Sequence, residues 1–226
     1  CTQVPFDPGT SDRSFSFFAA DAGMVVMLPP LVKSLHQQAP GVRLKAVQLE
    51  EDHLHDWLKS GKVDLAIGSY PSLTQGIRRQ RLFMATFMSL VRKGHPRLTT
   101  EPTLEDFAAE QHVLVSSSGT GHGVELTEHA LEAAIPAHHF TVRVPGFTAA
   151  AVVAKHTDAV VTLPSPLAAV LARELDLELI KPPLRLPRFE VAQYWHERFH
   201  REAGNQWFRS VLHERFSGDA RFDGSD

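Results

Sequence analysis

Strand-like and helix-like segments alternate along almost the whole 226-residue chain. Residues 13–19 are rich in Phe and read as a strand, and Met24, Leu28, Leu31 and Leu35 then recur at helical spacing. A regular alternation of strands and helices predicts parallel sheets with helices on both faces, and right-handed crossovers restrict the topology further. The sequence therefore predicts an α/β fold.

The other predicted elements follow the same alternation. Strands are expected over 42–49, 63–68, 112–116, 140–144, 159–163 and 189–196, and helices over 52–60, 104–109, 124–134, 147–155, 166–173 and 202–216. Residues 82–92 read as one long, apolar, extended run. Asp21 is expected to cap the first helix, and Pro29 and Pro30 are tolerated best if they lie in its first turn.

Two series of strands and helices flank the run at 82–92, and the strand at 189–196 precedes the last helix. The economical arrangement is two Rossmann-like lobes joined by two crossing strands. Lobe I would comprise residues 1–88 plus 194–226, and lobe II residues 89–193. Ligands of open α/β sheets sit beyond the carboxyl ends of the strands, so we expect these ends to line a shared cleft.

The charge and composition exclude several classes of partner. The net charge is −3 and the sequence pI is about 6.5, which argues against nucleic-acid binding by this segment, because phosphate binding calls for a concentrated basic surface. The short basic run Arg78, Arg79 and Arg81 is expected to be a solvated strand edge. The chain contains no run of 18 apolar residues, so the sequence predicts no membrane span.

The lone cysteine, Cys1, excludes a disulfide within the chain and is compatible with the cytosol. Cys1 leaves two interpretations open, the lipidated first residue of a lipoprotein or the start of a fragment. The sequence contains no Cys/His motif that would predict a metal site. His196 and His200 are four residues apart, but a strand is expected to end between them, so they would not share one helix face. Residues 119–123 (GTGHG) match a dinucleotide loop only in part, and no nucleophile elbow surrounds Ser117. We therefore expect no cofactor, no metal and no catalysis.

Seven segments together resemble the effector-binding domain of LysR-type transcriptional regulators, in the branch that contains NahR and NodD. They are residues 15–31 (FSFFAADAGMVVMLPPL), 61–68 (GKVDLAIG), 92–96 (RKGHP), 120–123 (TGHG), 144–147 (VPGF), 195–196 (WH) and 202–209 (EAGNQWFR). The resemblance runs from about Phe6 to Phe216. It implies the type 2 periplasmic-binding-protein architecture, which agrees with two lobes.

The resemblance also implies a function and its partners. A small-molecule effector would bind in the inter-lobe cleft and control a DNA-bound homodimer or homotetramer in the cytoplasm. The winged helix-turn-helix domain of the family does not appear before Cys1, so DNA binding would belong to that absent part. Two rival functions stay open: a solute-binding lipoprotein of a transport system, and an enzyme on the same fold.

Helix N-termini dominate the expected site, because their free amides and partial positive charge favour a carboxylate. Four such helix starts are expected, after Ala20-Asp21, Tyr70-Pro71, residues 120–122 and residues 145–147. By the resemblance, the effector-binding residues would be Ala20, Asp21, Met27, Ser69, Tyr70, His122, Gly146, Phe147 and Trp195.

Several of these residues have an equally simple structural interpretation. Met27 and Phe147 could be plain core, Trp195 could pack the lobe junction, and His122 could be a surface histidine bonded to nearby backbone. Relatives that bind aromatic acids often have a hydroxyl residue where Ala20 stands and an aromatic residue where Met27 stands. An aromatic carboxylate is therefore only one of the possible effectors.

Overall fold

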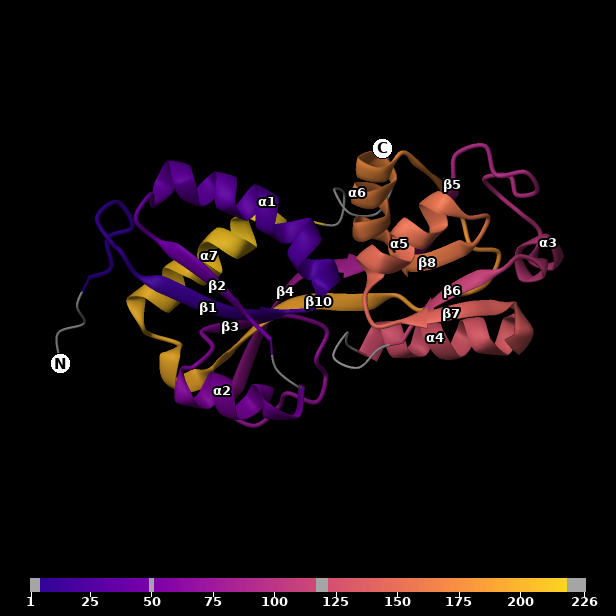
Figure 1. The fold of residues 1–226 in the computed structure, drawn as a ribbon. Helices are drawn as coiled ribbons and strands as arrows, with labels where there is room; N and C mark the ends of the chain where they lie inside the picture. Colours follow the sequence, from indigo (N-terminus) through magenta and orange to yellow (C-terminus); the bar gives the residue numbers. More distant parts are fainter. Residues whose placement is uncertain (1–4, 49–50, 117–121, 219–226) are drawn as a thin grey trace. The chain divides into compact units, whose positions relative to one another are not determined.

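The computed structural model describes residues 5–48, 51–116 and 122–218. These residues form two compact units, each built on its own five-stranded sheet (Figure 1). Unit 1 runs up to Phe83 and resumes at Glu190, and unit 2 is Met84–Phe189. The chain thus passes between the units near residues 83 and 189, whereas the sequence-based boundaries stood after residues 88 and 193.

The sheet of unit 1 has the strand order β2-β1-β3-β10-β4. Its strands are β1 (Ser14–Ala19), β2 (Arg43–Val47), β3 (Leu65–Gly68), β4 (Ile77–Ala85) and β10 (Phe189–His196). The first three are parallel, as the alternation with helices predicts, but β10 is antiparallel to β3. Strands are parallel where a crossover helix joins them, and no crossover helix of this unit leads into β10.

Helices cover both faces of this sheet: α1 (Asp21–Gln38), α2 (Leu54–Ser60) after the 3-10 turn Glu51–His53, and α7 (Ala203–Phe216) after the 3-10 turn Glu197–Phe199. On one face Phe18, Leu54, Leu58, Tyr70 and Tyr194 share one buried cluster. On the other face Phe15 of β1 stacks on Phe208 of α7, with ring centroids 4.8 Å apart. The two faces follow from the alternation of side chains along β1 and β10.

The sheet of unit 2 has the strand order β7-β6-β8-β5-β9. Its strands are β5 (Phe87–Arg92), β6 (His112–Val115), β7 (Phe140–Val144), β8 (Val160–Pro164) and β9 (Leu177–Ile180). Its helices are α3 (Leu104–Ala109), α4 (His122–Ala134), α5 (Phe147–His156) and α6 (Ser165–Leu175), with a 3-10 turn at Ala137–His139. Strand β6 is parallel to β7 and β8, whereas β5 is antiparallel to β8 and β9.

Unit 2 combines an apolar core with a buried charged group. Phe107, Leu114, Leu131 and Val160 are among the residues of its buried cluster. Beside them the carboxylate of Glu110, only 6% exposed, accepts two hydrogen bonds from Arg97, at 2.6 and 2.8 Å. This two-point pairing compensates the removal of the carboxylate from water.

Helix α1 differs from the sequence prediction in two respects. Its N-cap is Ala20 rather than Asp21, because the backbone leaves the extended conformation one residue earlier, and Asp21 is the first helical residue. Pro29 and Pro30 lie in the interior of the helix rather than in its first turn. The helix nevertheless buries Met27, Leu31 and Leu35 on one face.

Three other segments also differ from the prediction. The run at 82–92 is not one extended strand, because Thr86 separates β4 from β5 and these strands belong to different sheets. No helix follows Tyr70-Pro71, where a turn closed by a hydrogen bond from Leu73 N to Tyr70 O leads to β4. Strand β9 was not predicted at all, because it is four residues long and includes Glu178.

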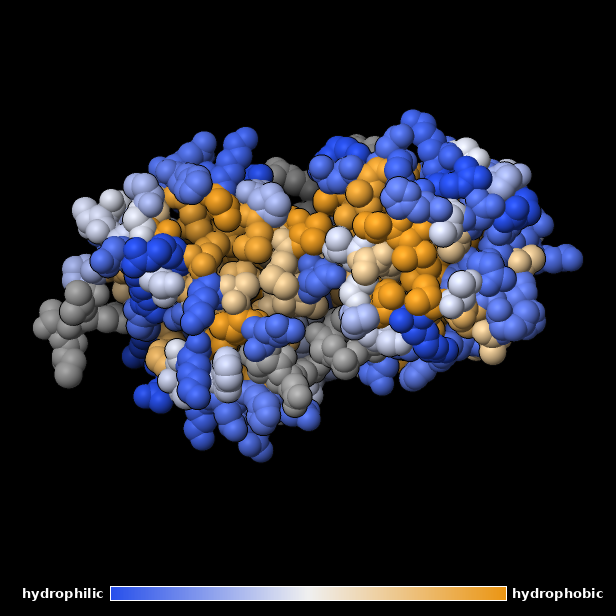
Figure 2. Space-filling view, in the orientation of Figure 1, coloured by the Kyte–Doolittle hydropathy of each residue, from blue (hydrophilic) through white to orange (hydrophobic). Residues whose placement is uncertain are grey.

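The surface of the described residues mixes polar and apolar side chains. Figure 2 shows hydrophobic residues in the middle of the visible face of each unit, with hydrophilic residues around them. The large hydrophobic side chains with the greatest exposure are Val32, Leu104, Leu126, Val152 and Leu179, each on a different helix or strand. Single exposed residues of this kind need no partner.

Candidate functional site

The start of α1 is the first candidate position in unit 1. Its N-cap Ala20 has an extended backbone and no side chain that caps the helix, and Asp21 supplies an acidic group in the first turn. Ala20 and Asp21 are both partly exposed, whereas Met27 is 4% exposed and belongs to the core. Ala20 and Asp21 are thus the partly exposed residues of this helix start, and Met27 is a core residue of the same helix.

Tyr70 is a core residue. Its side chain is 1% exposed, its hydroxyl donates to the carbonyl of Ile67 at 3.4 Å, and its amide donates to the hydroxyl of Tyr194 at 3.1 Å. Gly68 permits this packing, because its φ of +154° suits glycine and a Cβ there would lie 2.7 Å from the Tyr70 hydroxyl. Of the predicted pair, Ser69 is the partly exposed residue at the end of β3.

The start of α5 is the candidate position in unit 2. Gly146 is its N-cap, with φ −135° and ψ 146° and no capping side chain, and it is partly exposed. Phe147 follows as a core residue with 1% exposure. His122 is the first residue of α4, but its side chain and residues 117–121 lie outside the description.

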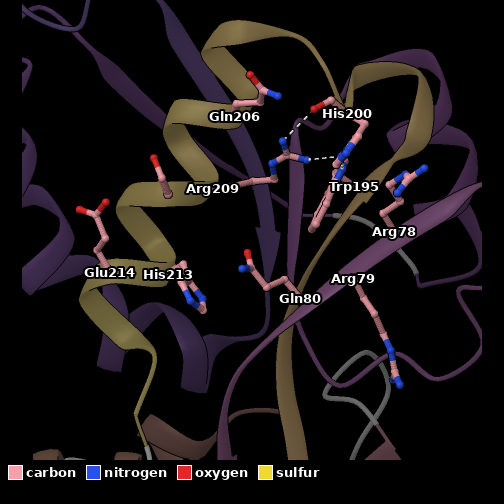
Figure 3. Close-up of a pocket in the computed structure, with 10 residues that line it drawn as sticks. Arg78, Arg79, Gln80, Trp195, His200, Gln206, Arg209, His213 and Glu214 are labelled. Carbon is pink, nitrogen blue, oxygen red and sulfur yellow. Dashed lines mark hydrogen bonds between the residues drawn. The ribbon is translucent and has the colours of Figure 1, made fainter.

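Trp195 lies apart from Tyr70 within unit 1. Ala192 and Tyr194 of β10 face the buried cluster that contains Tyr70, so Trp195 lies on the opposite face of the strand. There Trp195 lines a pocket of about 570 Å³ with other residues of unit 1 (Figure 3). The lining residues are Arg78, Arg79, Gln80, Trp195, His200, Gln206, Arg209, Ser210, His213 and Glu214. We call this cavity the α7 pocket.

Three side chains form the inner wall of the α7 pocket. The guanidinium carbon of Arg209 lies 4.1 Å from the ring centroid of Trp195. The indole N–H of Trp195 and Nη1 of Arg209 both donate to His200 Nδ1, each at 3.3 Å, and Nη2 of Arg209 donates to the His200 carbonyl at 2.9 Å. These contacts fix the three groups relative to one another.

The hydrogen bonds also determine the protonation of His200. Indole and guanidinium nitrogens are donors only, so His200 Nδ1 must be an acceptor and the proton of the neutral ring is on Nε2. Burial, and repulsion by Arg78, Arg209 and Arg201, lower the pKa of His200, which favours the same neutral form. Burial and the nearby Arg78 likewise lower the pKa of Arg209.

The α7 pocket was largely unpredicted from the sequence. Of its lining residues only Trp195 was among the predicted site residues, and Arg78 and Arg79 were expected to form a solvated strand edge. That expectation agrees with their exposure on β4, an edge strand of its sheet. The signal that could have found the pocket is the WH pair at 195–196 followed by His200 and Arg209, but their meeting depends on the turn between β10 and α7.

The described residues lack two kinds of feature, a metal-binding cluster and a membrane-spanning helix. They contain no group of three or more His, Cys, Asp or Glu side chains arranged to hold a metal ion. None of their helices combines the length and the hydropathy that a membrane crossing requires.

Comparisons with known proteins assign the family. Residues 9–217 match the model of the LysR substrate binding domain. The transcriptional activator NahR of Pseudomonas putida is 34% identical over 213 residues, which cover 94% of this chain and 70% of that protein. The transcriptional regulator LinR of Sphingobium indicum is 32% identical over 212 residues, with coverage of 94% and 70%.

Solved structures agree with this assignment. A transcriptional regulator of Pseudomonas aeruginosa is 33% identical, covers 94% of this chain and 70% of its own, and superposes with a TM-score of 0.80. A transcriptional regulator of Vibrio parahaemolyticus is 27% identical, with coverage of 92% and 97% and a TM-score of 0.81. The regulatory domain of MexT, 22% identical with a TM-score of 0.70, shares the fold. The chain belongs to the LysR substrate-binding-domain family, and its two lobes have the fold of the effector-binding regulatory domains of LysR-type regulators.

Proposed function

We propose that this chain senses a small-molecule effector on behalf of a cytoplasmic LysR-type regulator and catalyses no reaction. The observation that carries the proposal is the family match over residues 9–217, together with relatives that are transcriptional regulators. Ligand binding would shift the population of conformations, and the shift is limited by the difference in affinity for them.

The residues proposed for effector binding lie at strand ends and helix starts within each unit. Ala20, Asp21 and Ser69 of unit 1 and Gly146 of unit 2 are partly exposed at these positions. The N-cap residues of α1 and α5 make no side-chain capping hydrogen bond, and the dipole of each helix favours an anion near its first turn. In this proposal Met27, Tyr70 and Phe147 shape the site from the core, and His122 and Trp195 remain candidates.

DNA contact and assembly belong to the same proposal. The net charge of −3 gives this chain no general affinity for phosphates. The chain spans about 70% of the length of relatives such as NahR, and we assign DNA contact to the part of those proteins that it does not match. One structural relative, CbnR, has been solved with its target DNA. The working form would be a homodimer or homotetramer.

A thermal-shift screen of small aromatic and aliphatic carboxylates tests effector binding. A ligand that binds the folded chain at 100 times its Kd stabilises it by about 2.7 kcal/mol and raises the melting temperature. Gly146→Phe places a bulky side chain at the start of α5 and should abolish the shift, and Gly146→Ala, the matched control, should keep most of it. A full shift in Gly146→Phe would remove Gly146 from the site, and no shift with any carboxylate would contradict a carboxylate effector.

A further inference from the structure

Two cationic groups of the α7 pocket form no ion pair with any described carboxylate. Arg78 and Arg209 both line it, and no described carboxylate oxygen lies within 4.0 Å of either guanidinium. Arg79 is different, because it pairs with Glu190 at 3.4 Å. Glu202, the carboxylate that acts on Arg209 from a distance, is itself paired with Arg13 at 2.8 Å.

The inner wall of the pocket is rigid. Arg209 is 7% exposed and is held by its two contacts with His200 and by the ring of Trp195. Arg78, on the exposed side of β4, lines the same pocket and lowers the pKa of both Arg209 and His200 by disfavouring their protonated forms. Two neighbouring cations repel each other, and an anion bound between them would relieve this repulsion.

Hydrogen-bond donors add to this positive charge. Because His200 Nδ1 already accepts two hydrogen bonds, the remaining ring proton is on Nε2, which has no hydrogen-bond partner among the described residues. Gln206 and Ser210 contribute an amide and a hydroxyl from α7. Glu214 is the acidic member of the lining, and it lies on the exposed side of α7 (Figure 3).

We propose that the α7 pocket of unit 1 binds a small organic carboxylate between Arg78 and Arg209, at a second ligand site separate from the candidate effector site. Planar guanidinium groups match a carboxylate with two parallel hydrogen bonds. The volume of about 570 Å³ is in the range of small-molecule sites and exceeds the needs of a bare inorganic ion, so the rest of the ligand would occupy the pocket beside Gln80, Gln206 and Ser210.

The test follows the indole N–H signal of Trp195 by NMR while the 226-residue chain is titrated with benzoate, acetate or inorganic phosphate. The three tryptophans give three indole signals, and Trp195→Phe identifies the relevant one. We expect benzoate to move this signal with a Kd on the order of 1 mM, and acetate and phosphate, which fill less of the pocket, to bind more weakly than benzoate. Equal binding of phosphate and benzoate would overturn the organic carboxylate, and an unmoved signal would overturn the site.

A matched pair of variants locates the binding. Arg78→Gln should weaken benzoate binding at Trp195 about tenfold or more, because it removes one charged hydrogen-bond donor. Arg81→Gln removes the same charge from the same exposed strand but from outside the pocket lining, and it should leave the Kd within about twofold of the original value. Equal effects of the two substitutions would show that only net charge matters and would overturn the pocket.

The result is separable from that for the proposed effector site. Gly146→Phe should leave the benzoate titration at Trp195 unchanged, and Arg78→Gln should leave the effector-induced thermal shift unchanged. Loss of the Trp195 response in Gly146→Phe would overturn the second site, because it would show that a single site accounts for both measurements.

Discussion

Acid should destabilise unit 2 through a single buried histidine, His112. This residue begins β6, is 2% exposed, and lies between the rings of Phe107 and Phe140 at centroid distances of 4.8 and 6.1 Å. Its Nε2 lies 2.7 Å from the carbonyl oxygen of Phe107, so the neutral ring donates there. Burial is the largest influence on His112 and lowers its pKa to about 4, with the hydrogen bond to Phe107 acting in the opposite direction.

The direction of the effect follows from proton linkage. The pKa of His112 is lower in the folded state than the unfolded value of 6.5, so the unfolded chain binds the proton first as the pH falls. The contribution of His112 to stability is therefore complete above pH 6.5 and is lost between pH 6.5 and pH 4. The loss is about 2 kcal/mol at pH 5 and about 3 kcal/mol below pH 4.

Urea denaturation of the original chain and of His112→Gln at several pH values between 5 and 7.5 measures this loss. Glutamine retains an N–H that can donate to Phe107 O but does not titrate. Between pH 7.5 and pH 5, the free energy of unfolding should therefore fall by about 2 kcal/mol less for His112→Gln than for the original chain. A lower overall stability of the variant would not affect this comparison, because each protein is compared with itself at the two pH values.

The exposed His156 provides the control, because His156→Gln should keep the pH dependence of the original chain. The lowered pKa values of His196 and His200 in unit 1 act in both proteins and cancel in the comparison. Parallel pH profiles for the original chain and His112→Gln would refute the assignment of the effect to His112.

Two further predictions concern backbone and helix ends. Gly61 ends α2 with φ +78°, and a Cβ there would lie 2.9 Å from the ring of Phe199, whereas Gly94 has φ +67° and open space around it. Gly94→Ala should cost about 1 kcal/mol of unfolding free energy for backbone strain alone, and Gly61→Ala should cost more; equal values in denaturant titrations would contradict the ring contact. Glu202 caps α7 by accepting from the amides of Gly204 and Asn205 at 3.0 and 2.8 Å. Glu202→Ala should lower the melting point by the equivalent of about 1 kcal/mol, and an unchanged melting point would show that the cap contributes nothing.

The sequence predicts the helices and strands of this fold well where hydrophobic periodicity is strong. The strands at 140–144 and 189–196 have the predicted bounds, and α3 does as well. The failures have local causes. Strand β9 is too short to show a period, and an apolar run does not reveal that Thr86 divides it between two sheets.

The candidate sites show a different limit. The helix starts at Asp21 and Phe147 could be predicted, because apolar periodicity begins there. The α7 pocket could not, because Arg78 comes to it from β4 while His200 and Arg209 follow β10. Contacts between residues more than 100 positions apart depend on the strand order, and local patterns do not determine the neighbours of β10.

The position of β10 inside its sheet, between β3 and β4, has a consequence for synthesis on the ribosome. The described residues of unit 2 lie within one stretch of the chain, so all of its strands are available once residue 189 has emerged. Unit 1 is begun before unit 2 but completed after it, since β10 must insert between β3 and β4 once the strands of unit 2 have been made (Figure 1). The nascent chain therefore carries an incomplete sheet of unit 1, with the unpaired strand edges of β3 and β4, while unit 2 is synthesised.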